Sequence, residues 1–266
     1  MNDQNQSESR QPSRMPVVFI GHGNPMNAIE DSDYSRNWEA LGRDLPRPKA
    51  IACISAHWLT DGPFATAMEE PRTIHDFYGF PQELFEVQYP APGSPAVAAR
   101  VSQANQSVQP DLQWGLDHGT WSVLKRMYPA ADIPVVQVSV DVSGGPELQY
   151  ELGKTLRPLR NDGILFVASG NIVHNLGVVR FIANAEPYDW AVEFDEQCAE
   201  LLANRSDEAL IHYRELGEAA RMSIPTDDHY RPILAALGLS EQSDPIRFFN
   251  EGIDLASIGM RSFVLG

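Results

Sequence analysis

Four short runs of apolar, mostly β-branched residues divide the chain. They cover residues 16–20, 50–54, 133–140 and 163–168, and three of them lead directly into a Gly or a Ser. Continuous apolar runs of four to eight residues are typical of strands covered on both faces, as in a mostly parallel sheet flanked by helices. The pattern therefore predicts four buried strands. A shorter run at 261–265 predicts a closing strand.

Helical patterns lie between these runs. They cover residues 96–108, the stretch from 146 to 156, and 189–203. The first follows Ser94 and Pro95, an N-cap residue and a first-turn proline. Alternation of strand and helix predicts an α/β fold with a single, mostly parallel mixed sheet flanked by helices. The stretch from Asp61 to Pro95 is rich in Pro and aromatic residues but has no period, so we expect a long ordered loop over the sheet.

The first fourteen residues are polar and contain no apolar stretch. They predict a disordered tail, residues 1–14, ahead of one domain over 15–266, and they do not resemble a secretory signal. The two cysteines, Cys53 and Cys198, have no metal-binding or redox spacing. We expect both to be small buried side chains in a protein of the reducing cytoplasm.

The net charge of the chain limits the classes of molecule that it is expected to bind. The 266 residues include 20 Lys and Arg against 36 Asp and Glu, a formal net charge of −16 with His neutral. So acidic a chain argues against nucleic-acid binding and against docking on anionic membranes. Its apolar runs are also far shorter than the roughly 18 residues of a membrane span. We detect no signature that predicts an oligomeric state.

Three of the seven histidines come soon after predicted strands. His22 and His57 follow the first two runs, and His174 follows the fourth. In open α/β sheets, ligands bind beyond the carboxyl ends of the strands, so three imidazoles delivered there would converge. The alternative is that each His only caps or hydrogen-bonds its own turn. No short metal motif such as HExxH decides between these readings.

We expect different roles for the other four histidines. His229 follows two aspartates, which could orient its ring, and His118 lies in an Asp-His-Gly turn that could face the same crevice. His75 lies in a loop that could line a pocket mouth, whereas His212 falls on the polar side of a helical pattern and is expected at the surface. The sequence has no GxSxG nucleophile elbow, no GxGxxG and no Walker motif.

An ordered set of motifs resembles a known family. In order along the chain, they are Gly21-His22-Gly23-Asn24-Pro25, Ser55-Ala56-His57-Trp58, Asp76-Phe77-Tyr78-Gly79-Phe80-Pro81, Asp117-His118-Gly119, Ser169-Gly170-Asn171 with His174, and Asp228-His229. Together they resemble the 4,5-DOPA extradiol dioxygenases, a branch of the class III extradiol ring-cleaving superfamily. The resemblance covers nearly all of residues 15–266.

The resemblance implies a divalent metal at the carboxyl ends of the strands, held by His22, His57 and His229. It implies that His174 is the acid/base or an additional ligand, and that His118 helps to bind substrate or oxygen. Protocatechuate-type relatives have a glutamate where this branch has His229. Three neutral imidazoles suit Zn(II) as well as Fe(II), but zinc has no redox chemistry.

The implied reaction is cleavage of a catechol such as L-DOPA beside its diol, with incorporation of O2. Trp58, Phe77 and Tyr78 are candidates to cover the substrate ring, although aromatic residues more often serve packing. His174, with an ordinary pKa near 6.5, would take a phenolic proton. Two alternatives remain: a zinc-dependent hydrolase using the same histidines, and a non-catalytic binding protein on the same scaffold.

Overall fold

A computed structural model describes residues 14–182 and 184–266 of the chain. Its core is an eight-stranded sheet with the strand order β4-β3-β5-β2-β6-β1-β10-β7. The four predicted central strands are β1 (Val17–Gly21), β2 (Ala50–Thr60), β5 (Val135–Asp141) and β6 (Ile164–Gly170). They pair in parallel, while the closing strand β10 (Ser262–Leu265) pairs antiparallel with β1. The predicted mostly parallel mixed sheet is confirmed.

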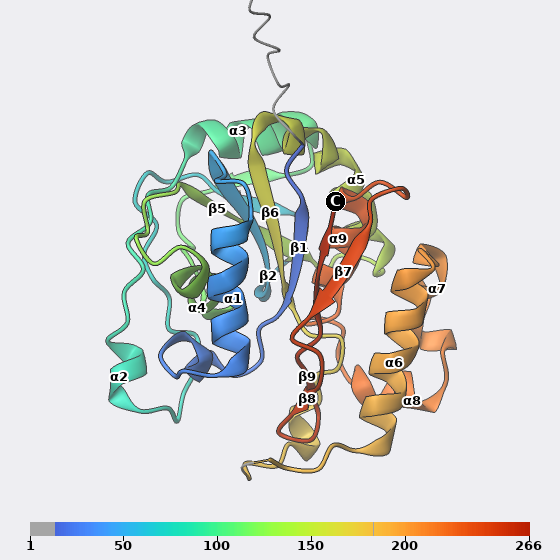
Figure 1. Ribbon diagram of the computed structural model, residues 1–266. Helices are drawn as coiled ribbons and strands as arrows, with labels where there is room; N and C mark the ends of the chain where they lie inside the picture. The colour runs from blue at the N-terminus through green and yellow to red at the C-terminus, as the bar shows by residue number, and fades with distance from the viewer. Residues whose placement is uncertain (1–13, 183) are drawn as a thin grey trace, which may run out of the picture.

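Helices cover both faces of this sheet (Figure 1). Val18 and Ile20 of β1 belong to the apolar cluster that contains Trp38 of α1 (Asp33–Asp44) and residues of α4 (His118–Met127). Their neighbours Val17 and Phe19 belong to the opposite cluster, with α5 (Glu147–Leu156), α6 (Asp189–Ala203) and α9 (Arg231–Leu239). Successive side chains of a strand point to opposite faces, so burial of both faces explains the uninterrupted apolar runs.

The remaining elements are short or lie at the margins of the sheet. They are η1 (Pro25–Ala28), β3 (Phe64–Thr66), α2 (Gln82–Phe85), α3 (Pro95–Ala104), β4 (Gln109–Asp111), η2 (Arg157–Asp162), η3 (Leu176–Val178), α7 (Asp207–Ile211), η4 (Tyr213–Glu215), α8 (Glu218–Ser223), β7 (Ile246–Phe249), β8 (Ile253–Asp254) and β9 (Ile258–Gly259).

Two sequence expectations need correction. The segment from Asp61 to Pro95 is not only loop, because it contains β3 and α2. The predicted helix over 96–108 ends earlier, at Ala104, and is followed by β4. Elements of three or four residues are too short to show a period, and helix ends are the least certain part of any pattern. The start of α3 is as predicted, since the Ser94 hydroxyl accepts the Val97 N–H at 3.2 Å.

The expected tail, residues 1–14, lies outside the described residues except for Arg14, which pairs with Asp244. Cys53 and Cys198 are fully buried and free, as predicted. In the described part of the chain, no helix combines the length and apolar character needed to cross a bilayer.

The carboxyl ends of β1 and β6 lie side by side, next to the middle of β2. Gly21 of β1 is in register with Gly170 of β6, and Ser169 of β6 with Ser55 of β2. Beyond Ser55, β2 leaves β6, and its pairing with β5 shifts register between Ile54 and Leu59. Such an irregularity re-aims the side chains that follow it. In β2, the first residue after this point whose side chain lines the cavity described below is His57.

Candidate metal centre

Five histidines line one cavity of about 480 Å³ at this edge of the sheet. His22 follows β1, His57 lies in β2, and His118 is the first residue of α4. His174 comes after β6, and His229 precedes α9. The convergence predicted for His22, His57 and His174 is therefore observed, and His118 and His229, which the sequence motifs also assigned to this site, line the same cavity.

The closest approach in the cluster is between His22 and His57. Their Nε2 atoms lie 3.0 Å apart. Two nitrogen ligands that are each about 2.1 Å from one ion and at right angles to each other would be separated by about 3.0 Å. Burial and the neighbouring histidines lower the pKa of both rings well below the usual value, so both are neutral. Neutral imidazoles are the form that binds metals.

Hydrogen bonding sets the tautomer of His22. The Ser169 hydroxyl donates to the Gly119 carbonyl at 2.6 Å, so its single proton is used. It can only accept from His22 Nδ1, which lies 3.0 Å away. With Nδ1 protonated, the lone pair of His22 is on Nε2, the atom that faces His57. Ser169 thus prepares His22 as a ligand.

His57 and His229 have carboxylates at the equivalent position. His57 Nδ1 lies 3.4 Å from Asp76 Oδ2, and His229 Nδ1 lies 2.5 Å from Asp228 Oδ2. Burial opposes ionisation of Asp228, but its interactions with His229, Thr226 and His174 together outweigh burial and lower the pKa of the carboxyl. Oxygen partners at Nδ1 are what metal-binding histidines usually have, because they orient the ring and free Nε2.

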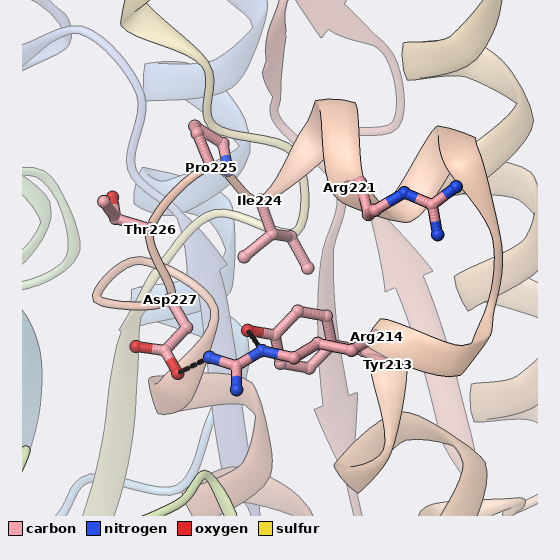
Figure 2. Close-up of a pocket in the computed structure, with 7 residues that line it drawn as sticks. All are labelled: Tyr213, Arg214, Arg221, Ile224, Pro225, Thr226 and Asp227. Carbon is pink, nitrogen blue, oxygen red and sulfur yellow. Dashed lines mark hydrogen bonds and ion pairs between the residues drawn. The ribbon is translucent and has the colours of Figure 1, made fainter.

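Ion pairs and hydrogen bonds of the neighbouring Asp227 hold the loop that carries Asp228 and His229 in place. Figure 2 shows a second hollow, of about 330 Å³, in which Arg214 lies between Tyr213 and Asp227. Arg214 Nη2 is 3.6 Å from Asp227 Oδ2, and the buried Arg231 of α9 donates to both Asp227 oxygens at 2.9 and 3.1 Å. On the sheet side, a Cβ at Gly170 would lie 2.2 Å from the His229 carbonyl oxygen, so only glycine allows this close approach.

His174 stacks on His229, with ring centroids 3.5 Å apart and planes at 9°. Burial, and then the neighbouring His229, lower the pKa of His174 to about 2. The pKa of His174 therefore lies far below the unperturbed imidazole value near 6.5. His174 is neutral at working pH, and only an acidified partner can protonate it.

His118 lies at the start of α4 beside His57, with ring centroids 3.8 Å apart. Asp117 is the N-cap of this helix, and Asp76 accepts the His118 backbone N–H at 3.0 Å. His118 Nδ1 is buried and also lies 3.0 Å from Asp76 Oδ1. Because the Asp76 carboxylate lies beside Nδ1, Nε2 is the His118 nitrogen left for a ligand.

A buried polar network supports this corner. Ser55 donates to Asp117 at 2.6 Å, and the Gln137 amide donates to the other Asp117 oxygen. Burial, and then the nearby Asp76, raise the pKa of Asp117 to about 6. A Cβ at Gly119 would meet Ser55 Oγ at 2.4 Å and His57 Cδ2 at 2.9 Å. The helix start therefore lies directly against His57.

The ligand atoms form two groups. Atoms of His22, His57 and His118 lie within 4.8 Å of one another, as do atoms of His174, Asp228 and His229. The two groups adjoin, because the His229 ring centroid is 4.8 Å from that of His57 and 5.3 Å from that of His22. A cluster of five imidazoles, two of which bring their Nε2 atoms within 3.0 Å, fits one divalent metal ion.

Of the predicted aromatic residues, Phe77 and Tyr78 line the cavity and Trp58 does not. Trp58 is buried and stacks on Trp114, with ring centroids 5.6 Å apart. The expectation that Trp58 covers the substrate ring is therefore wrong. His57 lies inside β2 rather than after it, so the next residue points to the other face of the sheet.

The two remaining histidines lie elsewhere. His75 contacts the Val87 carbonyl at 2.9 Å and packs on Trp121, and it is not part of the cavity lining. His212 is 53% exposed and pairs with Glu208, as expected of a surface residue.

Asp76, Ser169 and Phe80 were not predicted as site residues from the sequence. Asp76 and Phe80 line the cavity, and Ser169 lies beneath His22. The available signal was local: Ser169 is a polar residue at the end of an apolar strand, and Asp76 and Phe80 flank two aromatic residues already under consideration.

Comparison with known proteins agrees with this geometry. Residues 16–265 match the family described as the catalytic LigB subunit of aromatic ring-opening dioxygenase. The chain is 46% identical over 260 residues to the "4,5-DOPA dioxygenase extradiol" of Escherichia coli K12, covering 96% of each chain. It is 36% identical to the Beta vulgaris protein of the same name, covering 90% of this chain and 91% of the relative.

A solved structure shows the same fold. A crystal structure of an Escherichia coli K12 protein superposes with a TM-score of 0.82 at 43% identity, covering 95% of this chain and all of that one. The shared fold, the family match and the histidine cavity lead to one conclusion. The chain belongs to the LigB family of aromatic ring-opening dioxygenases and is an enzyme of the extradiol dioxygenase type.

Proposed function

We propose that the protein is an Fe(II)-dependent extradiol dioxygenase that cleaves a catechol such as L-DOPA at the 4,5 bond, with incorporation of O2. The observation that carries this proposal is the 3.0 Å approach of His22 Nε2 and His57 Nε2 inside a cavity of about 480 Å³. That volume lies in the range of small-molecule sites. The names of the bacterial and plant relatives support the choice of substrate.

We propose His22, His57 and His229 as the metal ligands. Each has Nδ1 beside an oxygen, from Ser169, Asp76 or Asp228, which leaves Nε2 for the ion. His118 lies in the same group as His22 and His57 and is the competing third ligand. A bound Fe(II) would acidify the hydroxyls of a coordinated catechol and supply the redox chemistry with O2, whereas Zn(II) would supply only the first.

We assign proton transfer and substrate hydrogen bonding to the two remaining histidines of the cavity. A free catechol hydroxyl has a pKa near that of Tyr, about 10, and cannot protonate a ring with a pKa of about 2. His174 therefore accepts a proton only from a hydroxyl that is already acidified, and it returns that proton readily to a later anionic oxygen. His118 lines the same cavity and can hydrogen-bond the substrate or oxygen.

Aromatic side chains form part of the cavity wall beside the histidines. Phe77 and Phe80 line the cavity and lie edge to face, with centroids 5.3 Å apart. Phe77 is also 5.5 Å from the His118 ring. An apolar wall here excludes water and leaves a flat surface for an aromatic ring.

The test is reconstitution with Fe(II) under nitrogen, followed by a panel of catechols and then air. We expect a yellow ring-opened product only with iron, catechol and O2 together. Zn(II)-loaded protein is the matched control and should give no product. Absence of product across the panel, or turnover by the zinc form without O2, would contradict the proposal and favour the binding-protein or hydrolase alternative.

A further inference from the structure

The described residues that line the catalytic cavity include no Lys or Arg. Its polar lining consists of the five histidines, Asn24, Asp76 and the hydroxyl-bearing Tyr78. The other large side chains of the inner wall are apolar, among them Phe77, Phe80, Val179, Leu255 and Ile258. A substrate carboxylate entering this cavity would lose water without gaining a cationic partner from the protein. Such unpaired burial is costly.

The fixed charges that are present disfavour an anion further. The Asp76 carboxylate faces the cavity beside His57 and His118, and the whole chain has a net charge of −16. An acidic molecule repels anionic ligands before contact, and a nearby carboxylate does so within the site.

The mouth of the same cavity is apolar and open to solvent. Tyr78, Leu176 and Phe181 all line the cavity, yet they are 93%, 62% and 80% exposed. Tyr78 comes from the loop before α2, and Leu176 and Phe181 from the segment after β6. Single exposed apolar residues need no explanation, but three gathered around one opening indicate a binding surface. We call these three residues the apolar rim.

Resting on the proposed function, we propose that the cavity selects catechols whose ring substituent has no net negative charge and is long enough to contact the apolar rim. The diol lies among the histidines, the ring lies against Phe77 and Phe80, and the carbon chain of the substituent lies on the rim. Net-neutral catechols fit this class, including zwitterionic ones, and carboxylate-bearing catechols without a compensating ammonium do not.

Dihydrocaffeate and its methyl ester provide the sharpest test, because they share a skeleton and differ in charge. We expect the wild-type iron enzyme to favour the ester by about tenfold in kcat/KM. Leu176→Lys places a cation on the rim and should reduce that preference about threefold, through a lower KM for dihydrocaffeate. Leu112→Lys is the control, because Leu112 is 71% exposed but lies outside the cavity lining.

Binding is measured separately by calorimetry under nitrogen, so the result does not depend on turnover. Equal affinity and equal kcat/KM for acid and ester, or a ratio that Leu176→Lys leaves unchanged, would overturn the charge preference while the proposed function stands. If the protein cleaves no catechol at all, the proposed function is wrong, and the binding ratio alone decides the preference. If neither the acid nor the ester binds, the proposed charge preference is also overturned.

Discussion

At the scale of single residues, the three proposed ligands share one arrangement. His22, His57 and His229 each have an oxygen beside Nδ1, from a hydroxyl in one case and a carboxylate in two. For His22 and His229 the neighbour hydrogen-bonds Nδ1 and so leaves Nε2 free before any ion is bound. Three residues far apart in sequence would not share this arrangement if each only capped its own turn.

Removal of a ligand should release the metal. We expect His22→Ala and His57→Ala to lose most of the bound metal, since each removes one of few ligands in a buried site. Metal per chain after reconstitution, by elemental analysis, is the measurement. His212→Ala is the matched histidine control because that side chain is exposed and distant, and it should retain the wild-type metal content. Full metal in His22→Ala would contradict the assignment.

Comparing His229→Ala with His118→Ala identifies the third ligand. We expect His229→Ala to lose metal, and His118→Ala to retain it while its KM for catechol rises. The reverse outcome would show that the group formed by His22, His57 and His118 binds the ion instead.

Asp228→Asn tests the carboxylate behind His229. The amide keeps the shape but weakens the orienting hydrogen bond, so we expect metal affinity to fall about 10- to 100-fold. Competition with a chelator measures this, and Asp189→Asn at an exposed position is the control. Unchanged affinity would mean that Asp228 does not orient the ligand.

His174→Ala should separate metal binding from catalysis. We expect most of the metal to remain and kcat to fall about 10²- to 10⁴-fold, the usual effect of losing an acid/base. Equal loss of metal would show that His174 is primarily a ligand.

At the scale of elements, the central sheet was predictable because burial on both faces leaves an unmistakable apolar run in β1, β2, β5 and β6. β3 and α2 were not, since three or four residues carry no period. The role of Trp58 was mispredicted for a related reason. The register shift that extends β2 past Ile54 cannot be read from apolar content, so the sequence did not show that His57 and Trp58 alternate across one strand.

The close contact between β6 and the His229 loop leads to a prediction at this scale. Gly170→Ala puts a Cβ 2.2 Å from the His229 carbonyl, so we expect lower stability together with reduced metal per folded chain. Gly42→Ala is the matched control: its Cβ would lie 2.0 Å from the Met127 carbonyl, between α1 and the end of α4. That variant should lose stability but bind metal normally. Equal metal loss in both would indicate a general folding defect.

At the scale of the whole molecule, a buried ion pair joins η2, in the middle of the chain, to the segment before β7. Arg160 donates to Asp244 at 2.7 Å, and both side chains are nearly inaccessible. Burial acts to raise the pKa of Asp244, but hydrogen bonds from the Glu241 backbone and Arg160 outweigh it, and the pKa is lowered. The folded state thus favours the ionised carboxylate. This contribution to stability is present above the unfolded pKa of about 3.9 and is lost as pH falls through the folded value.

We expect Asp244→Asn to reduce the free energy of unfolding by about 3 kcal/mol at pH 7, because it leaves Arg160 buried and unpaired. The difference from wild type should shrink as pH falls below about 4. Urea unfolding across this range is the measurement. Asp132→Asn removes an exposed pair with Arg47 and should change stability by less than about 1 kcal/mol. A deficit in Asp244→Asn that persists unchanged in acid would contradict this account.

The claim on which the function depends is that imidazoles from separate elements hold one divalent ion. Anomalous diffraction at the iron edge, from crystals of Fe(II)-loaded protein grown under nitrogen, tests it most directly. The account predicts one peak about 2.1 Å from the Nε2 atoms of His22, His57 and His229. No peak among these rings, or an ion held elsewhere on the protein, would contradict it.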